Sequence, residues 1–62
     1  MPSLKEIRVI QMEQLFKLMK LKKVNTEAGI NVKDLDNLII EAETTMDKED
    51  VAWVREKVSE LK

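Results

Sequence analysis

Apolar residues recur at helical spacing along almost the whole chain, with polar residues between them. At about 100° per residue, a spacing of three and four places such residues on one side of a helix. Only one proline, Pro2, and one glycine, Gly29, interrupt this pattern. The pattern therefore predicts an all-α domain of three helices near residues 3–22, 32–45 and 47–61, with a bend at Gly29.

Capping signals mark the ends of these segments. Ser3 and Glu6 form a capping box, in which the serine hydroxyl accepts a hydrogen bond from the Glu6 amide. Asn31 and Asp47 are the predicted caps of the second and third helices. The first helix should end at Lys22 or Lys23, because the positive charges of lysines are favourable near the negative end of the helix dipole. A short turn at residues 26–28 should then lead into Gly29, and Met46 should pack against Val51 as a hydrophobic staple.

The first helical segment carries two apolar stripes. One is widened by Ile10 and consists of Leu4, Ile7, Leu15, Leu18 and Leu21. The other, rotated by about 120°, consists of Val9, Met12, Phe16 and Met19. The other two helices are short and can cover one of these stripes more easily than both stripes. We therefore expect a homodimer to form through the second stripe. An antiparallel pair would place the basic end of this helix, residues 17–23, over Glu6 and Glu13 of the partner. A three-helix bundle with this segment at its centre and a different partner protein are the alternatives.

Each of the other two segments has one apolar face and one apolar residue outside it. The face of the second segment contains Val32, Leu35, Leu38, Ile39, Ala42 and Met46. The stripe of the third contains Val51, Val54, Val58 and Leu61. Ile40 and Trp53 stand off these faces, and we predict that they bind a partner protein. The alternative for Trp53 is that it closes the edge of the core.

Residues 24–38, VNTEAGINVKDLDNL, follow the spacing of a helix-turn-helix. With Gly29 at the turn, the apolar positions are filled by Val24, Ala28, Ile30, Leu35 and Leu38. The positions that would face a DNA groove include Asp34 and Asp36 and only one base, and acids at such a surface oppose phosphate binding. We therefore interpret this stretch as a helix-turn-helix-like bend with a structural role.

The residue types exclude most catalytic chemistry. Without cysteine or histidine the chain has no disulfide, no thiolate or imidazole metal ligand, and no histidine general base. One glycine cannot build a glycine-rich phosphate loop. Asp34 and Asp36 are two residues apart on a helix and do not face each other. We predict a protein that is not an enzyme and that uses no cofactor or metal.

The net charge of −1 hides an asymmetry along the chain. Residues 1–24 hold six bases and two acids, a balance of +4, and residues 25–62 hold five bases and ten acids, a balance of −5. Attraction between helices of one chain is one interpretation, and a charged partner is the other. If the chain binds nucleic acid, the candidate contacts are Lys17, Lys20, Lys22 and Lys23.

Together these features favour a function by association. We expect one soluble cytoplasmic domain over residues 1–62, because no apolar run approaches the roughly 18 residues of a membrane span. Its predicted function is that of a small regulator or adaptor that binds itself and another protein. A small nucleic-acid-binding transcriptional regulator and a structural subunit of a larger assembly, such as a phage particle, are the alternatives.

Overall fold

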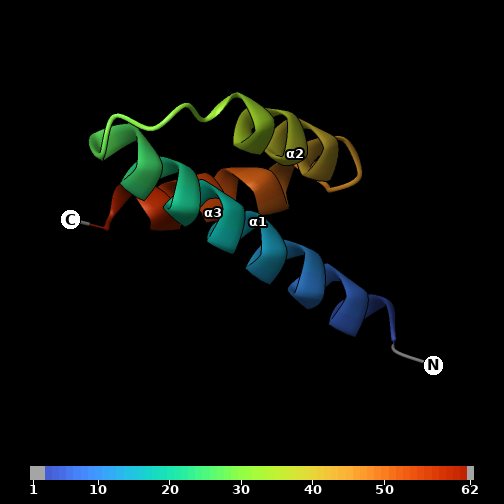
Figure 1. Cartoon of the computed structure of the whole chain (residues 1–62). Helices are drawn as coiled ribbons and strands as arrows, with labels where there is room; N and C mark the ends of the chain where they lie inside the picture. Colours follow the sequence, from blue (N-terminus) through green and yellow to red (C-terminus); the bar gives the residue numbers. More distant parts are fainter. Residues whose placement is uncertain (1–2, 62) are drawn as a thin grey trace.

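The computed structural model describes residues 3–61, which fold into three helices (Figure 1). Helix α1 spans Leu4–Glu27, α2 spans Lys33–Thr44 and α3 spans Lys48–Ser59. Within residues 3–61 there is no strand. The prediction of an all-α domain with three helices is therefore confirmed. In the same part of the chain, no helix combines the length and the apolarity that a membrane crossing requires.

Helix α1 begins at the predicted residue but ends later than predicted. The Ser3 hydroxyl accepts a hydrogen bond of 3.2 Å from the Glu6 amide, as the capping box requires. The predicted end at Lys22 or Lys23 and the separate turn at residues 26–28 are wrong, because α1 continues to Glu27 and no base lies in its last turn. The polar residues after Val24 lower helix propensity by less than about 0.7 kcal/mol each. That is too little to stop a helix before a glycine.

Gly29 ends α1 with a Schellman motif. Its φ of +76° lies in the left-handed region, where a side chain is disfavoured. The Gly29 amide donates to the Thr26 carbonyl at 3.1 Å, and the Ile30 amide donates to the Asn25 carbonyl at 2.8 Å. These two bonds satisfy carbonyls that the end of the helix leaves without partners. The predicted bend at Gly29 is present.

The predicted caps of α2 and α3 lie at or next to their expected positions. The Asn31 side chain accepts a hydrogen bond of 2.9 Å from the Lys33 amide, although the N-cap residue itself is Val32. Asp47 is the N-cap of α3 and has extended backbone geometry, but its side chain forms no cap hydrogen bond. Met46 and Val51 on either side of it are both partly buried against the core, as expected for a hydrophobic staple.

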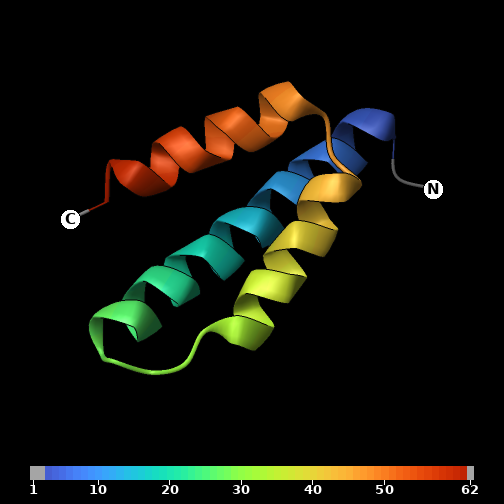
Figure 2. The same ribbon diagram turned by 90° about the horizontal axis from the view of Figure 1, so that it is seen from above.

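Helices α2 and α3 both pack on α1 and make few contacts with each other. Figure 2 shows α2 beside α1 and running in the opposite direction, while α3 lies on the other side of α1 at an angle to it. Each helix contributes one residue to the buried core, which consists of Leu15, Ile39 and Val54. Around them pack the partly buried residues Met12, Phe16, Leu18, Met19, Ala42, Met46, Val51 and Val58. Helix α1 is thus the central helix, and both of its apolar stripes take part in the core.

The N-terminal end of α1 projects beyond the other two helices (Figure 1). At 1.5 Å per residue, a 24-residue helix is about 36 Å long and a 12-residue helix about 18 Å. The longest dimension of the molecule, 40 Å, matches the length of α1. The first stripe, predicted as core, is therefore mostly uncovered. Leu15 is buried and Leu18 partly buried, but the exposed members are Leu4, Ile7, Ile10 and Leu21.

Two further expectations about burial are wrong. Leu38, assigned to the buried face of α2, is 48% exposed. Val24, Ala28 and Ile30, which the helix-turn-helix pattern places inside, are all exposed. The reason is that α2 folds back along α1 as an antiparallel hairpin, so the residues near the bend lie at the end of the molecule rather than at a crossing of two helices.

Candidate interaction surfaces

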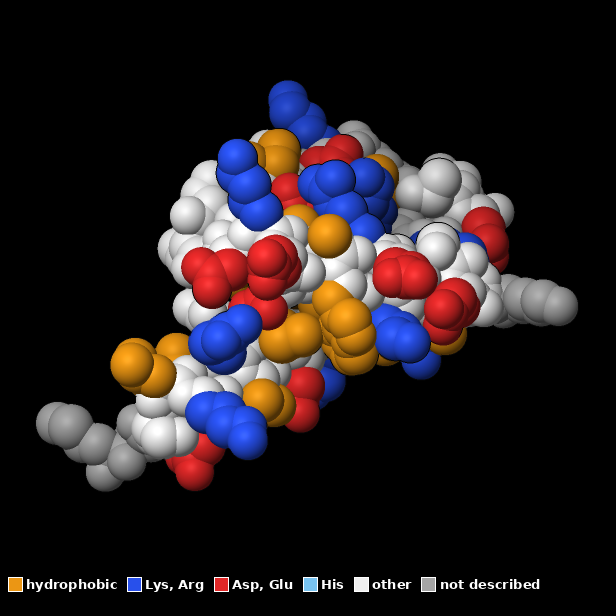
Figure 3. Space-filling view, turned by 180° about the vertical axis from the view of Figure 1, so that it is seen from behind, with side chains coloured by type: hydrophobic (Ala, Val, Ile, Leu, Met, Phe, Trp, Pro, Cys, Tyr) orange, Lys and Arg blue, Asp and Glu red, His pale blue; other side chains and the backbone are white. Residues whose placement is uncertain are grey.

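A hollow of about 370 Å³ lies between α1 and α3, and we call it the α1–α3 hollow. It is lined by Val9, Met12, Glu13, Phe16, Lys17 and Trp53. Met12 and Phe16 are half-buried against the core and form its base, whereas Val9 is exposed. Seen from the α3 side, hydrophobic side chains gather along the middle and lower part of the molecule, toward the projecting end of α1 (Figure 3).

Trp53 is the large aromatic residue of this hollow. It lies off the α3 stripe and lines the hollow together with Phe16 and Met12 of α1. Trp53 is 48% exposed. The Lys57 ammonium lies 5.5 Å from the centroid of the indole ring, within the range of a cation–π contact. Trp53 therefore presents an apolar surface beside a positive charge.

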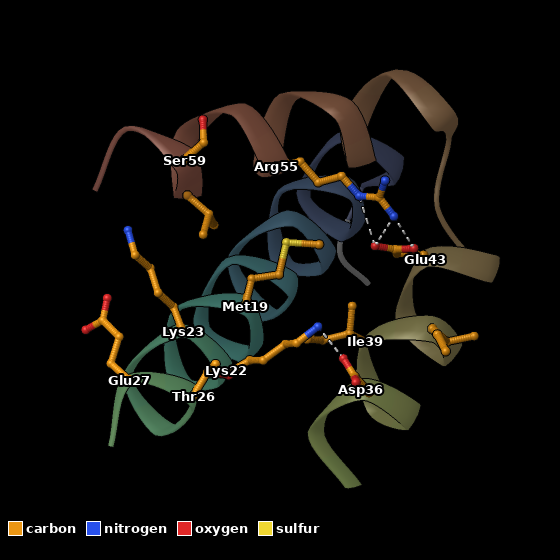
Figure 4. Close-up of a pocket in the computed structure, with 12 residues that line it drawn as sticks. Met19, Lys22, Lys23, Thr26, Glu27, Asp36, Ile39, Glu43, Arg55 and Ser59 are labelled. Atoms are coloured by element: carbon orange, nitrogen blue, oxygen red, sulfur yellow. Dashed lines mark hydrogen bonds and ion pairs between the residues drawn. The ribbon is translucent and has the colours of Figure 1, made fainter. Parts of the chain in front are cut away.

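A second, larger groove of about 650 Å³ separates α2 from α3 (Figure 4). Its apolar residues are Met19, Ile39, Ile40 and Val58. Ion pairs cross its rim: Arg55 of α3 binds Glu43 of α2, and Lys22 of α1 binds Asp36 of α2. These pairs occupy most of the charged groups near the opening. This α2–α3 groove exists because the two short helices diverge over α1.

The structure distributes the predicted association residues over both surfaces. Of the predicted self-association residues, Val9, Met12 and Phe16 line the α1–α3 hollow, whereas Met19 lines the α2–α3 groove. The predicted partner-binding residues also separate, with Trp53 in the hollow and Ile40 in the groove. The predicted association residues thus include all four apolar residues of the hollow but only two of the four in the groove.

Glu13 and Lys17 line the α1–α3 hollow. The sequence led us to expect them as a charge pair between two copies, not as neighbours of Trp53. Both are exposed and lie one helical turn apart on α1. The signal in the sequence was their spacing on either side of Phe16, which places them along one edge of the second stripe. They give the hollow one negative and one positive group.

The N-terminal ends of α1 and α3 are joined by an arginine contact. Arg8 donates two hydrogen bonds to the Asp50 carboxylate, at 3.1 Å from Nε and 2.9 Å from Nη2, and Asp47 lies 4.0 Å away. The hydrogen bond to Asp50, and then its charge, raise the pKa of Arg8 above its ordinary value. This contact links the start of α3 to the N-terminal part of α1.

The four lysines predicted as nucleic-acid contacts do not form one surface. Lys22 is paired with Asp36, and Lys23 donates a hydrogen bond to the Leu61 carbonyl at the end of α3. Lys17 and Lys20 are exposed. Half of the predicted set is therefore engaged in holding α2 and α3 in place.

Within residues 3–61, no group of three acidic side chains is arranged to hold a metal ion. The chain was also compared with known proteins. No protein-family model, no curated protein and no solved structure matches it.

Proposed function

We propose that this chain is a small protein–protein interaction module, a regulator or adaptor, and that the α1–α3 hollow binds the partner protein. The observation that carries the proposal is Trp53, an aromatic side chain left half exposed over the half-buried Met12 and Phe16. Exposed apolar clusters mark interaction sites, and tryptophan is enriched among the residues that dominate binding energies.

The lining of the hollow defines what it would accept. Val9, Met12, Phe16 and Trp53 suit one or two apolar side chains, and methionine adapts its shape to different ligands. Glu13 and Lys17 on the rim, with Lys57 beside the indole, would select among partners by charge. A short apolar helix flanked by both signs of charge fits this description.

Site-specific photo-crosslinking in the native cell tests the proposal. A photoreactive residue at position 9, which is exposed and lines the hollow, is expected to give an adduct heavier than two copies of the chain. The matched control is position 41 on α2, where Glu41 is exposed and lines neither surface. Absence of any adduct from position 9, or equal adducts from both positions, would refute the hollow as the binding surface.

Two alanine variants then distinguish the two apolar surfaces. Trp53→Ala should abolish the adduct, because it removes the largest contact in the hollow. Ile40→Ala removes an exposed apolar residue of the α2–α3 groove and should leave the adduct unchanged. If Ile40→Ala abolishes the adduct and Trp53→Ala does not, the partner binds in the α2–α3 groove instead.

A further inference from the structure

The side of α1 that faces away from α3 carries six apolar residues among polar ones, and five of the six are exposed. At about 100° per residue, Leu21 lies about 180° from Met12, which lines the α1–α3 hollow. Around Leu21 lie six more residues of α1. We call this side the outer face of α1 and define it as Leu4, Ile7, Ile10, Gln14, Leu18, Leu21 and Val24. All of them are exposed except Leu18, which is partly buried.

The outer face is symmetric about Gln14. Ile10 and Leu18 lie four residues before and after it, Ile7 and Leu21 lie seven residues away, and Leu4 and Val24 lie ten residues away. The outer face thus reads as the same apolar pattern in both directions along the helix. An antiparallel pair of identical helices requires this property, because a two-fold axis places each residue opposite its mirror position.

We propose that a second copy of this chain docks on the outer face of α1, with the two α1 helices antiparallel and the two-fold axis beside Gln14. Ile7 of one copy would then pack on Leu21 of the other, Ile10 on Leu18, and Leu4 on Val24. The two Gln14 amides meet at the axis, where each can donate to and accept from the other. In any shifted register, each Gln14 amide would lie against apolar side chains and lose its hydrogen-bond partner. The Gln14 pair therefore favours the register with the axis beside Gln14.

The charges along one edge of the outer face support the same pairing. Glu6, Glu13, Lys17 and Lys20 are exposed, and the ion pairs found within residues 3–61 include none of them. With the axis at Gln14, Lys17 of one copy lies about 3 Å along the helix from Glu13 of the other. Lys20 lies at the same offset from Glu6. A parallel pair would instead place Lys17 against Lys17.

The size of this interface indicates a weak dimer. The two helices overlap over residues 4–24, which is about 30 Å at 1.5 Å per residue, and a helix is about 10 Å wide. A standard interface takes about 800 Å² from each partner, roughly one sixth of the 5052 Å² surface of this chain. The area that one side of one helix can bury is smaller than this standard area. We therefore expect a dissociation constant in the micromolar range. The apolar lining of the α1–α3 hollow lies away from this seam, whereas Glu13 and Lys17 on its rim would pair with the second copy.

Sedimentation equilibrium with two neighbouring variants tests the surface. The wild-type mass should rise from 7.2 kDa toward twice that value between about 10 µM and 1 mM. Ile10→Lys should keep a mass of 7.2 kDa throughout, because it places an unpaired charge in the seam. Val9→Lys is the matched control, since Val9 and Ile10 are 46% and 47% exposed but lie on different sides of α1. It should associate like the wild type. Both variants should retain the helical circular dichroism signal.

Single cysteines test the orientation, since the chain has none of its own. Gln14→Cys should form a disulfide-linked dimer on mild oxidation, because the two positions meet at the axis. Leu21→Cys should not, since its two copies would be 14 residues apart along the seam, about 21 Å, far beyond disulfide reach. A mixture of Ile7→Cys and Leu21→Cys should crosslink.

Three results would overturn the antiparallel dimer. They are a wild-type mass of 7.2 kDa up to 1 mM, dissociation by Val9→Lys but not by Ile10→Lys, and crosslinking of Leu21→Cys alone as readily as Gln14→Cys. None of them bears on the α1–α3 hollow, whose proposed role rests on adducts heavier than a dimer. The two proposals can therefore fail separately.

Discussion

Arg55 of α3 donates hydrogen bonds from Nη2 to both carboxylate oxygens of Glu43 of α2, each at 2.8 Å, and a third from Nε at 3.3 Å. The Glu43 side chain is 19% exposed and that of Arg55 is 61% exposed. Since α2 and α3 make few other contacts, this arginine is the main direct link between them. It fixes the width of the α2–α3 groove at one end.

Replacing Arg55 with lysine should lower the free energy of unfolding by about 0.5–1 kcal/mol. Lysine keeps the charge but cannot bond both carboxylate oxygens in the planar geometry of a guanidinium. Urea unfolding followed by circular dichroism measures the change. Glu60→Gln, which disrupts the looser 3.7 Å pair with Lys57, is the control and should change stability by less. Equal stability of Arg55→Lys and wild type would show that the Arg55–Glu43 hydrogen bonds do not stabilise the fold.

Leu15→Ala should destabilise the domain by about 2–5 kcal/mol. Leu15 is fully buried at the centre of α1, so its truncation leaves a cavity between all three helices. A chain of this size is expected to have only about 3–9 kcal/mol of stability. Thermal and urea unfolding at low micromolar concentration should therefore show a largely lost transition. Leu38→Ala, at a half-exposed position, should cost clearly less, and a comparable loss there would contradict the burial pattern of α2.

Gly29→Ala should destabilise the domain by about 1 kcal/mol or somewhat more. The cost comes from the backbone alone, since φ is +76° and a Cβ at this position would meet nothing within 4 Å. Gly29→Asn should cost less, because asparagine tolerates the left-handed region. Urea unfolding of the three proteins should give the order glycine, asparagine, alanine. An alanine variant as stable as the wild type would mean that the bend relaxes to another conformation.

Binding to DNA should be weaker than a dissociation constant of about 100 µM at physiological salt. Lys22 and Lys23 are engaged with Asp36 and the Leu61 carbonyl, so only Lys17 and Lys20 of the four lysines remain for phosphates. Fluorescence anisotropy with random duplex DNA over a range of salt concentrations measures this. Tighter binding that falls steeply with salt would favour a nucleic-acid-binding function instead.

The sequence predicted what is local and missed what depends on neighbouring helices. The caps at Ser3 and Asp47, the stripe of α3 and the bend at Gly29 follow from adjacent residues. The end of α1 was missed because lysines near a helix end are a weaker signal than the absence of a glycine or proline. A helical wheel groups Met12, Phe16 and Met19 by angle. It does not say that α3 covers one part of the stripe while Met19 opens into the groove beside α2.

The same limit explains the outer face of α1. The sequence assigned Ile7, Ile10 and Leu21 to the core because their spacing is that of a buried stripe. Burial depends on whether a neighbouring helix lies on that side of α1 and is long enough to cover each residue, and α2 and α3 have only half the length of α1. Unequal helix length is a property of the whole chain that periodicity within one segment does not reveal.

The packing of α3 mainly on α1 has a consequence for the order of folding. Helices α1 and α2 are neighbours in sequence, whereas the contacts of α3 with α1 close long loops, as in the Arg8–Asp50 pair 42 residues apart. We therefore expect the α1–α2 hairpin to form first and α3 to dock last. Release of α3 should be the lowest-energy partial opening, visible as faster amide hydrogen exchange in α3 than at the centre of α1. Because Trp53 leaves with α3, the α1–α3 hollow exists only in the docked state, and a partner bound there would also hold the last helix in place.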